Sequence, residues 1–136
     1  MPSSPSSSFR TIVICDDQAP YRFFLRALLE QHRDLHVVGE GWHGGQAIEL
    51  MREHQPDVLV MDLAMPIMDG FAALPHALEA SPDTQVLVLT GLQDDDPLER
   101  ARELGAAIAV SKAIDPLELV AQVRELAGLT AAKLPS

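Results

Sequence analysis

Polar side chains that could do chemistry follow four separate apolar runs of this sequence. Asp16 and Asp17 follow TIVIC, Asp62 follows VLVM, Thr90 ends QVLVLT, and Lys112 lies just after AIAVS. If these runs are parallel strands, their carboxyl ends meet at one edge of a sheet, which is where ligands bind in such folds. Three carboxylates, one hydroxyl and one ammonium group would then converge on a single site.

Three neighbouring carboxylates repel one another and raise one another's pKa unless a cation lies among them. The set contains oxygen ligands only, which favours a hard ion such as Mg²⁺, an ion that keeps several waters and accepts phosphate oxygens. The sequence therefore predicts Mg²⁺ as cofactor and phosphoryl transfer as the chemistry. Asp62 would attack phosphorus and form an acyl phosphate, while Lys112 and Thr90 would each bind a phosphoryl oxygen.

Short runs rich in Val, Ile and Leu alternate with amphipathic segments, which predicts alternating strands and helices. The expected strands are 11–15, 35–40, 58–61, 85–90 and 107–110, and the expected helices are 19–32, 44–54, 70–80, 96–104 and 116–127. Strands that lack polar alternation are buried on both faces. The expected fold class is therefore α/β, with a five-stranded parallel sheet, doubly wound, and helices on both faces.

Several helix ends carry local signals. An N-cap aspartate followed by proline is expected at two helix starts, Asp96-Pro97 and Asp115-Pro116. Gly105 and Gly128 suit the residue after the last turn of the fourth and fifth helices. Pro75 lies past the first turn of the third helix, where proline removes a backbone hydrogen bond. We therefore expect a kink or a later start in that helix.

Composition excludes several classes of function. The 136 residues suit one domain, and the formal net charge of −10 repels phosphate backbones and anionic membrane surfaces. We therefore expect no nucleic-acid binding by this chain itself and no membrane association. One cysteine, Cys15, and the lack of a secretory signal favour the cytoplasm.

Four motifs, ICDDQ, VLVMDLAMPIMDG, VLVLTG and GAAIAVSK, occur in this order. Together they resemble the receiver domain of bacterial two-component response regulators, a flavodoxin-like fold. The segments ICDDQAPYRFFLRALLEQ and DPLELVAQVRELAG are similar in sequence to those of receivers that precede a LuxR-type helix-turn-helix output domain.

The resemblance implies a role for each matching residue. Asp62 corresponds to the phosphoacceptor and Lys112 to the lysine that contacts phosphate. Asp16 and Asp17 correspond to the acidic pair that holds Mg²⁺, with Asp62 and the backbone carbonyl of Ala64 as its further protein ligands. Thr90 corresponds to the switch hydroxyl. The implied donor is a histidine kinase or a phosphotransfer protein, and a homodimer is a further implied partner. The only implied catalysis is self-directed phosphorylation and dephosphorylation.

The expected organisation is a disordered Ser/Pro-rich tail at 1–9, a receiver domain at 10–128, and a C-terminal tail or linker start at 129–136. The chain is expected to be either a stand-alone receiver or the first part of a longer regulator with a DNA-binding output domain.

Two positions depart from the family pattern. Ala109 lies where receivers usually carry a Tyr or Phe that turns inward on activation, so we expect signalling through backbone shifts of the loop after Thr90. Ala113 follows Lys112 where the family often has a cis-proline, so we expect a trans peptide bond or a strained cis one.

Three other interpretations remain. A pseudo-receiver would keep the fold as an interaction module without phosphorylation, and Ala109 gives this alternative some weight. A phosphatase with an aspartate nucleophile would carry an Asp-x-Asp pair after the first strand, whereas Asp16 and Asp17 are adjacent. A flavin-binding domain would need a Ser/Thr-rich phosphate loop at that place. Asp16 and Asp17 could alternatively cap the helix that begins near Ala19.

Overall fold

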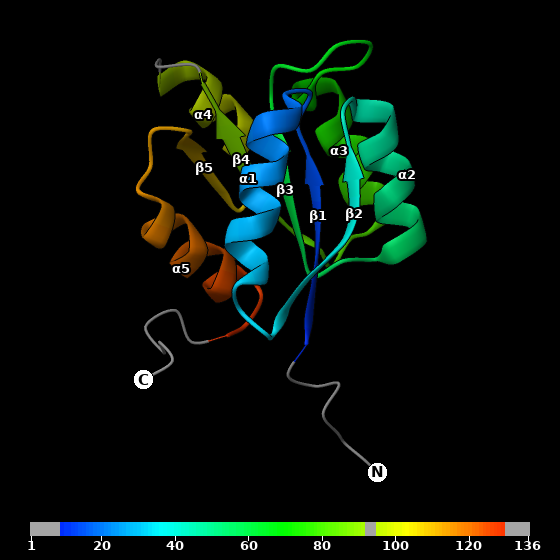
Figure 1. The fold of residues 1–136 in the computed structure, drawn as a ribbon. Helices are drawn as coiled ribbons and strands as arrows, with labels where there is room; N and C mark the ends of the chain where they lie inside the picture. Colours follow the sequence, from blue (N-terminus) through cyan, green and yellow to red (C-terminus); the bar gives the residue numbers. More distant parts are fainter. Residues whose placement is uncertain (1–8, 92–94, 130–136) are drawn as a thin grey trace.

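Five parallel strands form one sheet in the spatial order β2-β1-β3-β4-β5. The structure, a computed structural model, describes residues 9–91 and 95–129. The strands are β1 (Arg10–Cys15), β2 (Leu35–Gly41), β3 (Val58–Asp62), β4 (Gln85–Thr90) and β5 (Ile108–Ser111). The helices are α1 (Ala19–Glu30), α2 (Gly44–His54), α3 (Gly70–Ala80), α4 (Asp95–Glu103) and α5 (Pro116–Leu126) (Figure 1). The predicted doubly wound α/β fold is confirmed.

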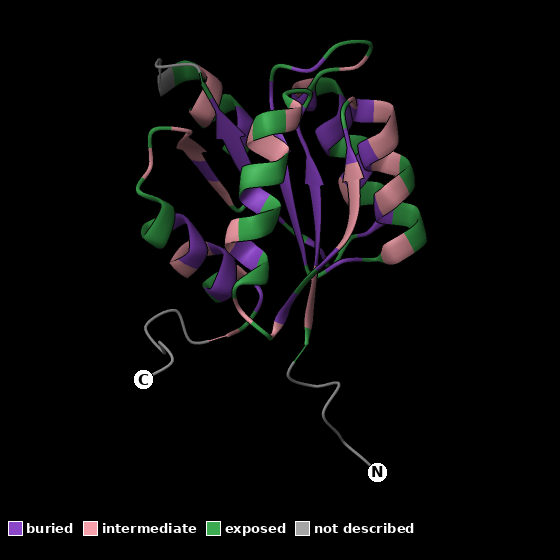
Figure 2. Cartoon of the chain, viewed as in Figure 1, coloured by how far each residue is buried: buried purple, intermediate pink, exposed green. Residues whose placement is uncertain are grey.

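Each face of the sheet has its own hydrophobic core. Helices α1 and α5 cover one face, and helices α2, α3 and α4 cover the other. Every residue of β3 is buried, and Figure 2 shows that the central strands are buried between the two helical layers. On α1 the buried residues are Leu25 and Leu29, one turn apart. Burial on both sides explains why the strands lack polar alternation.

One of the two predicted N-caps is confirmed and the other is wrong. The carboxylate of Asp115 accepts a hydrogen bond from the Leu117 amide at 2.8 Å. Helix α4 instead begins at Asp95, so Asp96 lies inside it. Pro97 still falls in the first turn, where backbone amides have no helical partner and none is lost. Gly105 and Gly128, predicted to follow the last turns of α4 and α5, have positive φ angles of +117° and +83°, which glycine adopts without strain.

Helix α3 begins at Gly70 and continues through Pro75, so the later start, one of the two predicted alternatives, is wrong. The kink stays a prediction. The carboxylate of Asp69 accepts a hydrogen bond from the Ala72 amide at 2.8 Å, which fixes the beginning of the helix at Gly70. Pro75 lies on the exposed side of the helix. The carbonyl that loses its helical partner there is therefore close to water, which reduces the cost of the missing bond.

Strand β2 contains one extra residue relative to β1. Ile12 pairs with Val37 but Val13 pairs with Gly39, so Val38 has no partner of its own. Because side chains alternate between faces, the extra residue reverses the faces of all later positions. Glu40 therefore lies on the α1 face, where its carboxylate binds Arg22 Nε at 3.0 Å and also binds Arg26.

An ion pair joins α5 to the turn before β2. The guanidinium of Arg124 is 6% exposed and donates two hydrogen bonds to the carboxylate of Asp34, at 2.7 and 3.0 Å. These bonds lower the pKa of Asp34 below its ordinary value of 3.8. The pair lies at the opposite edge of the sheet from the carboxyl ends of the strands, and it ties the last helix to the fold.

The predicted terminal segments lie largely outside the described residues. Of the tail at 1–9, only Phe9 is described, and its ring packs edge-on against His36 with centroids 4.5 Å apart. Of 129–136, only Leu129 is described, and its amide donates to the Arg124 carbonyl at 2.7 Å. None of the described helices is both long enough and apolar enough to span a bilayer.

The loop between β3 and α3 contains a strained residue. Ile67 has a φ of +67° and is 79% exposed, and the Met68 amide donates to the Pro66 carbonyl across it at 2.6 Å. A β-branched residue is unfavourable in this left-handed conformation, because its side chain crowds the backbone. Nothing gained by burial offsets this strain at Ile67.

We predict that Asp34→Asn lowers the free energy of unfolding by about 1–3 kcal/mol at pH 7, because the Arg124 guanidinium loses its charged partner. A carboxylate whose pKa is lowered by folding stabilises the protein above its unfolded pKa and loses that effect as the pH falls through the folded value. The difference in free energy of unfolding between wild type and Asp34→Asn should therefore become smaller below about pH 4. Urea unfolding at pH 7 and pH 3 measures this, with the exposed Asp83→Asn as control. An equal difference at both pH values contradicts the prediction.

We predict that Ile67→Asn raises the free energy of unfolding by about 1 kcal/mol, because asparagine tolerates the left-handed backbone. Thermal and urea unfolding of the two proteins provide the test. Leu117→Asn is the matched control, since Leu117 is similarly exposed but lies in the right-handed first turn of α5. Equal effects of the two substitutions would show that backbone strain is not the cause.

Candidate functional site

Three acidic side chains meet at the carboxyl ends of β1 and β3. These strands are neighbours, with Cys15 opposite Met61, so Asp16 lies beside Asp62. One carboxylate oxygen from each of Asp16, Asp17 and Asp62 lies within 4.8 Å of the others, so within the described part of the chain these acids form a group that could hold a metal ion. Asp16 and Asp62 are 2% and 4% exposed, whereas Asp17 is exposed. The site is thus a buried acidic pair with a third acid at its rim.

The predicted lysine lies in the same cluster. The Nζ atom of Lys112 is 2.7 Å from Asp16 Oδ2 and 3.2 Å from Asp62 Oδ2. The backbone amide of Lys112 donates to the Thr90 carbonyl at 2.7 Å, which holds the turn after β5 against the end of β4. Lys112 therefore bridges the two buried acids from a strand on the far side of β4.

Burial and repulsion set the electrostatics of the cluster. Burial raises the pKa of Asp62, the nearby charge of Asp16 raises it further, and Lys112 offsets part of the increase. Burial alone would lower the pKa of Lys112, but its contacts with Asp16 and Asp62 outweigh that effect and the pKa is raised. Lys112 is thus held in its charged form, as one ammonium group beside three carboxyl groups.

Thr90 and Ala64 complete the edge that the sequence predicted. Leu89 pairs with Asp62, so Thr90 lies one residue further along the same edge, and its side chain is fully buried. A Cβ atom added at Gly91 would have no neighbour within 4 Å among the described residues, so none of them crowds the position directly after Thr90. The Ala64 amide donates to Asp62 Oδ1 at 3.2 Å. The metal-ligand role of the Ala64 carbonyl stays a prediction.

The alternative role of Asp16 and Asp17 as helix caps is wrong. The N-cap position of α1 is Gln18, and no side chain caps this helix. Asp16 Oδ1 instead accepts from the Gln18 amide at 2.8 Å, which turns the chain immediately after β1 and directs Oδ2 toward Lys112. Neither acid of the pair therefore occupies the cap position of α1.

A second layer of polar contacts was not predicted from the sequence. Arg22 donates to the Asp16 carbonyl at 2.7 Å, and its Nε binds Glu40 at 3.0 Å. His43 caps α2, since its Nδ1 accepts from the amides of Gly45 and Gln46 at 3.0 and 3.3 Å. The contact of Arg22 could have been predicted from the sequence, because a first-turn position of α1 lies close to the end of β1. The contact of Glu40 could not, because its orientation depends on the extra residue in β2.

The two departures from the family pattern are visible in the fold. Ala109 pairs with Val88 and is buried in the same hydrophobic core as Ala101 and Ala106, on the α4 side of the sheet. No ring occupies this place to turn during switching. No cis peptide bond occurs within 9–91 or 95–129, so the bond between Lys112 and Ala113 is trans, as one of the two expected alternatives stated.

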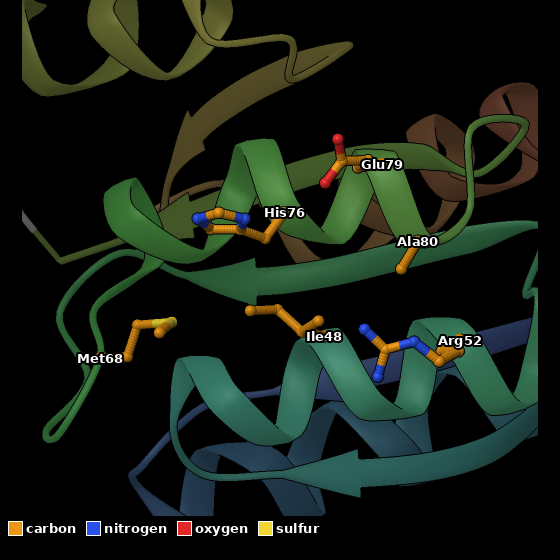
Figure 3. Close-up of a pocket in the computed structure, with 6 residues that line it drawn as sticks. All are labelled: Ile48, Arg52, Met68, His76, Glu79 and Ala80. Atoms are coloured by element: carbon orange, nitrogen blue, oxygen red, sulfur yellow. The ribbon is translucent and has the colours of Figure 1, made fainter.

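One surface hollow borders the acids, and another lies away from them. A hollow of ≈ 660 Å³ runs from Asp17 across Gln18 to Tyr21 and Phe24 at the start of α1. A second, of ≈ 460 Å³, lies between α2 and α3, where Figure 3 shows Ile48 and Arg52 on the α2 side and His76, Glu79 and Ala80 on the α3 side. This second groove contains none of the acidic residues of the site, and we assign it no part in the chemistry.

Known proteins are similar to this chain in sequence and in fold. The family model for the response regulator receiver domain matches residues 12–124. The chain is 39% identical over 109 residues to the transcriptional regulatory protein YhcZ of Bacillus subtilis, which covers 80% of this chain and 51% of that protein. It is 34% identical over 113 residues to LiaR of the same organism, covering 83% and 54%. The chain thus spans about half the length of these relatives.

Solved structures give the same result. A LuxR-family response regulator from Aurantimonas sp. SI85-9A1 is 35% identical with a TM-score of 0.81, covering 90% of this chain and 88% of that one. The receiver domain of NarL from Mycobacterium tuberculosis is 30% identical with a TM-score of 0.82, covering 88% and 97%. The resemblance inferred from the four motifs is therefore confirmed: the chain belongs to the response regulator receiver domains of two-component systems, with LuxR-family regulators among its relatives.

Proposed function

We propose that this chain is a Mg²⁺-dependent phosphoacceptor that takes a phosphoryl group onto Asp62. The observation that carries the proposal is the convergence of Asp16, Asp17 and Asp62 within 4.8 Å, with Lys112 bonded to both buried acids. A pseudo-receiver would need none of these groups. The intact set therefore favours phosphorylation over the interaction-module alternative.

The acid cluster suits a hard divalent ion. Receiver domains bind Mg²⁺ at an acidic pocket, and here three carboxylates face one lysine, which leaves an excess of negative charge for a cation to neutralise. We propose Asp16, Asp17 and Asp62 as the ligands, together with the Ala64 carbonyl. A bound Mg²⁺ supplies positive charge that polarises a phosphoryl oxygen.

The chain's own groups would carry the transfer as follows. A carboxylate oxygen of Asp62 forms a bond to phosphorus while the phosphorus–nitrogen bond of a phosphohistidine breaks, and its electron pair stays on the imidazole. Lys112 neutralises one phosphoryl oxygen, and the Thr90 hydroxyl donates to another. Water later attacks phosphorus, the bond from phosphorus to the Asp62 oxygen breaks, inorganic phosphate leaves, and the Asp62 carboxylate is restored.

The donor and the output follow from the family. Receiver domains interact with histidine kinases or phosphotransfer proteins, and we propose such a phosphohistidine protein as the donor. The position of Gly91, uncrowded by the described residues, and the hollow beside Asp17 leave room for it to approach. We propose that phosphorylation changes the surface of α4 and α5, and that a second copy of the chain is one partner for this surface. The cytoplasmic location inferred from the sequence stays a prediction.

We propose neither DNA binding nor esterase activity for this chain itself. LuxR-family relatives suggest a DNA-binding output domain as the recipient of the signal, whereas the net charge of −10 argues against DNA binding by this chain. One relative is a protein-glutamate methylesterase of Rhodospirillum centenum, but only 30% of that protein is matched. We propose no reaction on a separate substrate for this chain.

We predict that acetyl phosphate with Mg²⁺ adds one phosphoryl group to the wild-type protein and none to Asp62→Asn, because only Asp62 is positioned as nucleophile. Intact mass spectrometry over time is the measurement. Lys112→Met should slow the reaction roughly 10²-fold, since an oxygen loses its charged donor. Asp83→Asn should behave as wild type. Equal incorporation in Asp62→Asn and wild type would place the phosphoryl group elsewhere.

We predict that Mg²⁺ stabilises the wild-type protein, by about 2.7 kcal/mol at a hundred times its dissociation constant. Asp17→Asn should need a higher Mg²⁺ concentration for the same rise in melting temperature, because it loses a ligand without disturbing the buried pair. Asp83→Asn removes the same charge far from the site and should respond like wild type. If both variants respond alike, general electrostatics and not ligation explains the stabilisation.

A further inference from the structure

Lys112 has one contact with a group that is not an oxygen. Its Nζ atom lies 4.4 Å from the centroid of the Tyr21 ring, on the third residue of α1. A cation at this distance over an aromatic face is attracted by the negative charge of the ring face. The Tyr21 ring is half-buried and is itself supported by Phe24, one turn later, with centroids 5.9 Å apart. The ring therefore has a fixed place beside the acid cluster.

A bound metal ion would compete with Lys112 for its oxygen partners but not for the Tyr21 ring. Asp16 and Asp62 bind Nζ at 2.7 and 3.2 Å, and Gln18 Oε1 accepts from it at 3.4 Å. A divalent cation in the acid cluster would draw the carboxylate oxygens toward itself and repel the ammonium group. An aromatic face offers no ligand atom to Mg²⁺, so the contact with Tyr21 does not suffer this competition.

We propose that Tyr21 is a positioning residue that keeps the Lys112 ammonium group beside Asp62 when a cation occupies the acid cluster. The inference rests on the proposed function and deepens it, because it assigns a role to a residue that none of the four motifs singles out for chemistry. Tyr21 touches Lys112 and not the reacting atoms. It acts by limiting where the ammonium group moves when its bond to Asp16 weakens.

The effect depends on the ring and not on the hydroxyl. Tyr21→Phe keeps the aromatic face over which Lys112 lies, so its phosphorylation rate should stay within about twofold of wild type. Tyr21→Leu keeps an apolar side chain but removes the face, and a cation–π contact of ordinary strength converts to a roughly 2- to 30-fold slower reaction. The comparison thus separates electrostatic positioning from simple packing.

A matched contact elsewhere provides the control. Arg100 lies over the ring of Phe71 at the same 4.4 Å, between α4 and α3. Phe71→Leu should therefore remove an equivalent contact without changing the phosphorylation rate. The experiment measures rate constants with acetyl phosphate at saturating Mg²⁺ for wild type, Tyr21→Phe, Tyr21→Leu and Phe71→Leu, after thermal unfolding has shown that each is folded at the assay temperature.

Nuclear magnetic resonance tests the contact directly in the wild-type chain. Tyr21 is the only tyrosine, so its ring protons are identified without ambiguity. We expect a nuclear Overhauser effect between these protons and the Lys112 ε-methylene group, both without and with Mg²⁺. This measurement does not depend on any variant folding or on phosphorylation.

The outcomes separate the two proposals. A wild-type protein that gains no phosphoryl group overturns the proposed function, whatever the variants do. With an active wild type, the role of Tyr21 is overturned if Tyr21→Leu reacts as fast as wild type, if Tyr21→Phe is as slow as Tyr21→Leu, or if Mg²⁺ abolishes the Overhauser effect. A slower Tyr21→Leu with normal Tyr21→Phe and a persistent Overhauser effect supports it.

Discussion

The concentration of negative charge at one edge of the sheet is the constraint around which the rest of the molecule is arranged. Asp16 and Asp62 are almost fully buried beside each other, and such acids are unfavourable unless positive charge is near. Lys112 meets that need by crossing from β5 to bond both of them. The adjacency of β1 and β3, the hydrogen bond that holds the β5 turn to β4, and the position of Tyr21 all serve to keep this one ammonium group in place.

The strand order explains why this arrangement is available at all. The chain runs from β1 outward to β2 on one side and then to β3 on the other, so the ends of β1 and β3 diverge into separate loops. Ligands bind where a doubly wound sheet reverses in this way. Asp16 and Asp17 enter the site from one of these loops and Asp62 from the end of the neighbouring strand. The site is therefore a consequence of the fold's topology as much as of its residues.

Much of this was predictable because it depends on short-range patterns. The apolar runs indicated all five strands, and the residues that end them indicated the acids, Thr90 and Lys112. Local rules failed where a competing contact or position decides: α4 begins at Asp95 and Asp96 is no cap, and α3 accepts Pro75 on its exposed side. Contacts between distant segments were beyond reach, because nothing in the sequence alone links Asp34 with Arg124 or Tyr21 with Lys112.

The extra residue in β2 has a consequence for how sequences of this kind are compared. Side chains along a strand point alternately to the two faces of the sheet. The extra residue Val38 shifts this alternation, so that Glu40 faces α1 instead of α2. A sequence comparison that ignored the extra residue would place Glu40 on the other face of the sheet, the one that α2 covers. The position of Glu40 along β2, counted with the extra residue, thus decides that it binds Arg22, which in turn donates to the Asp16 carbonyl.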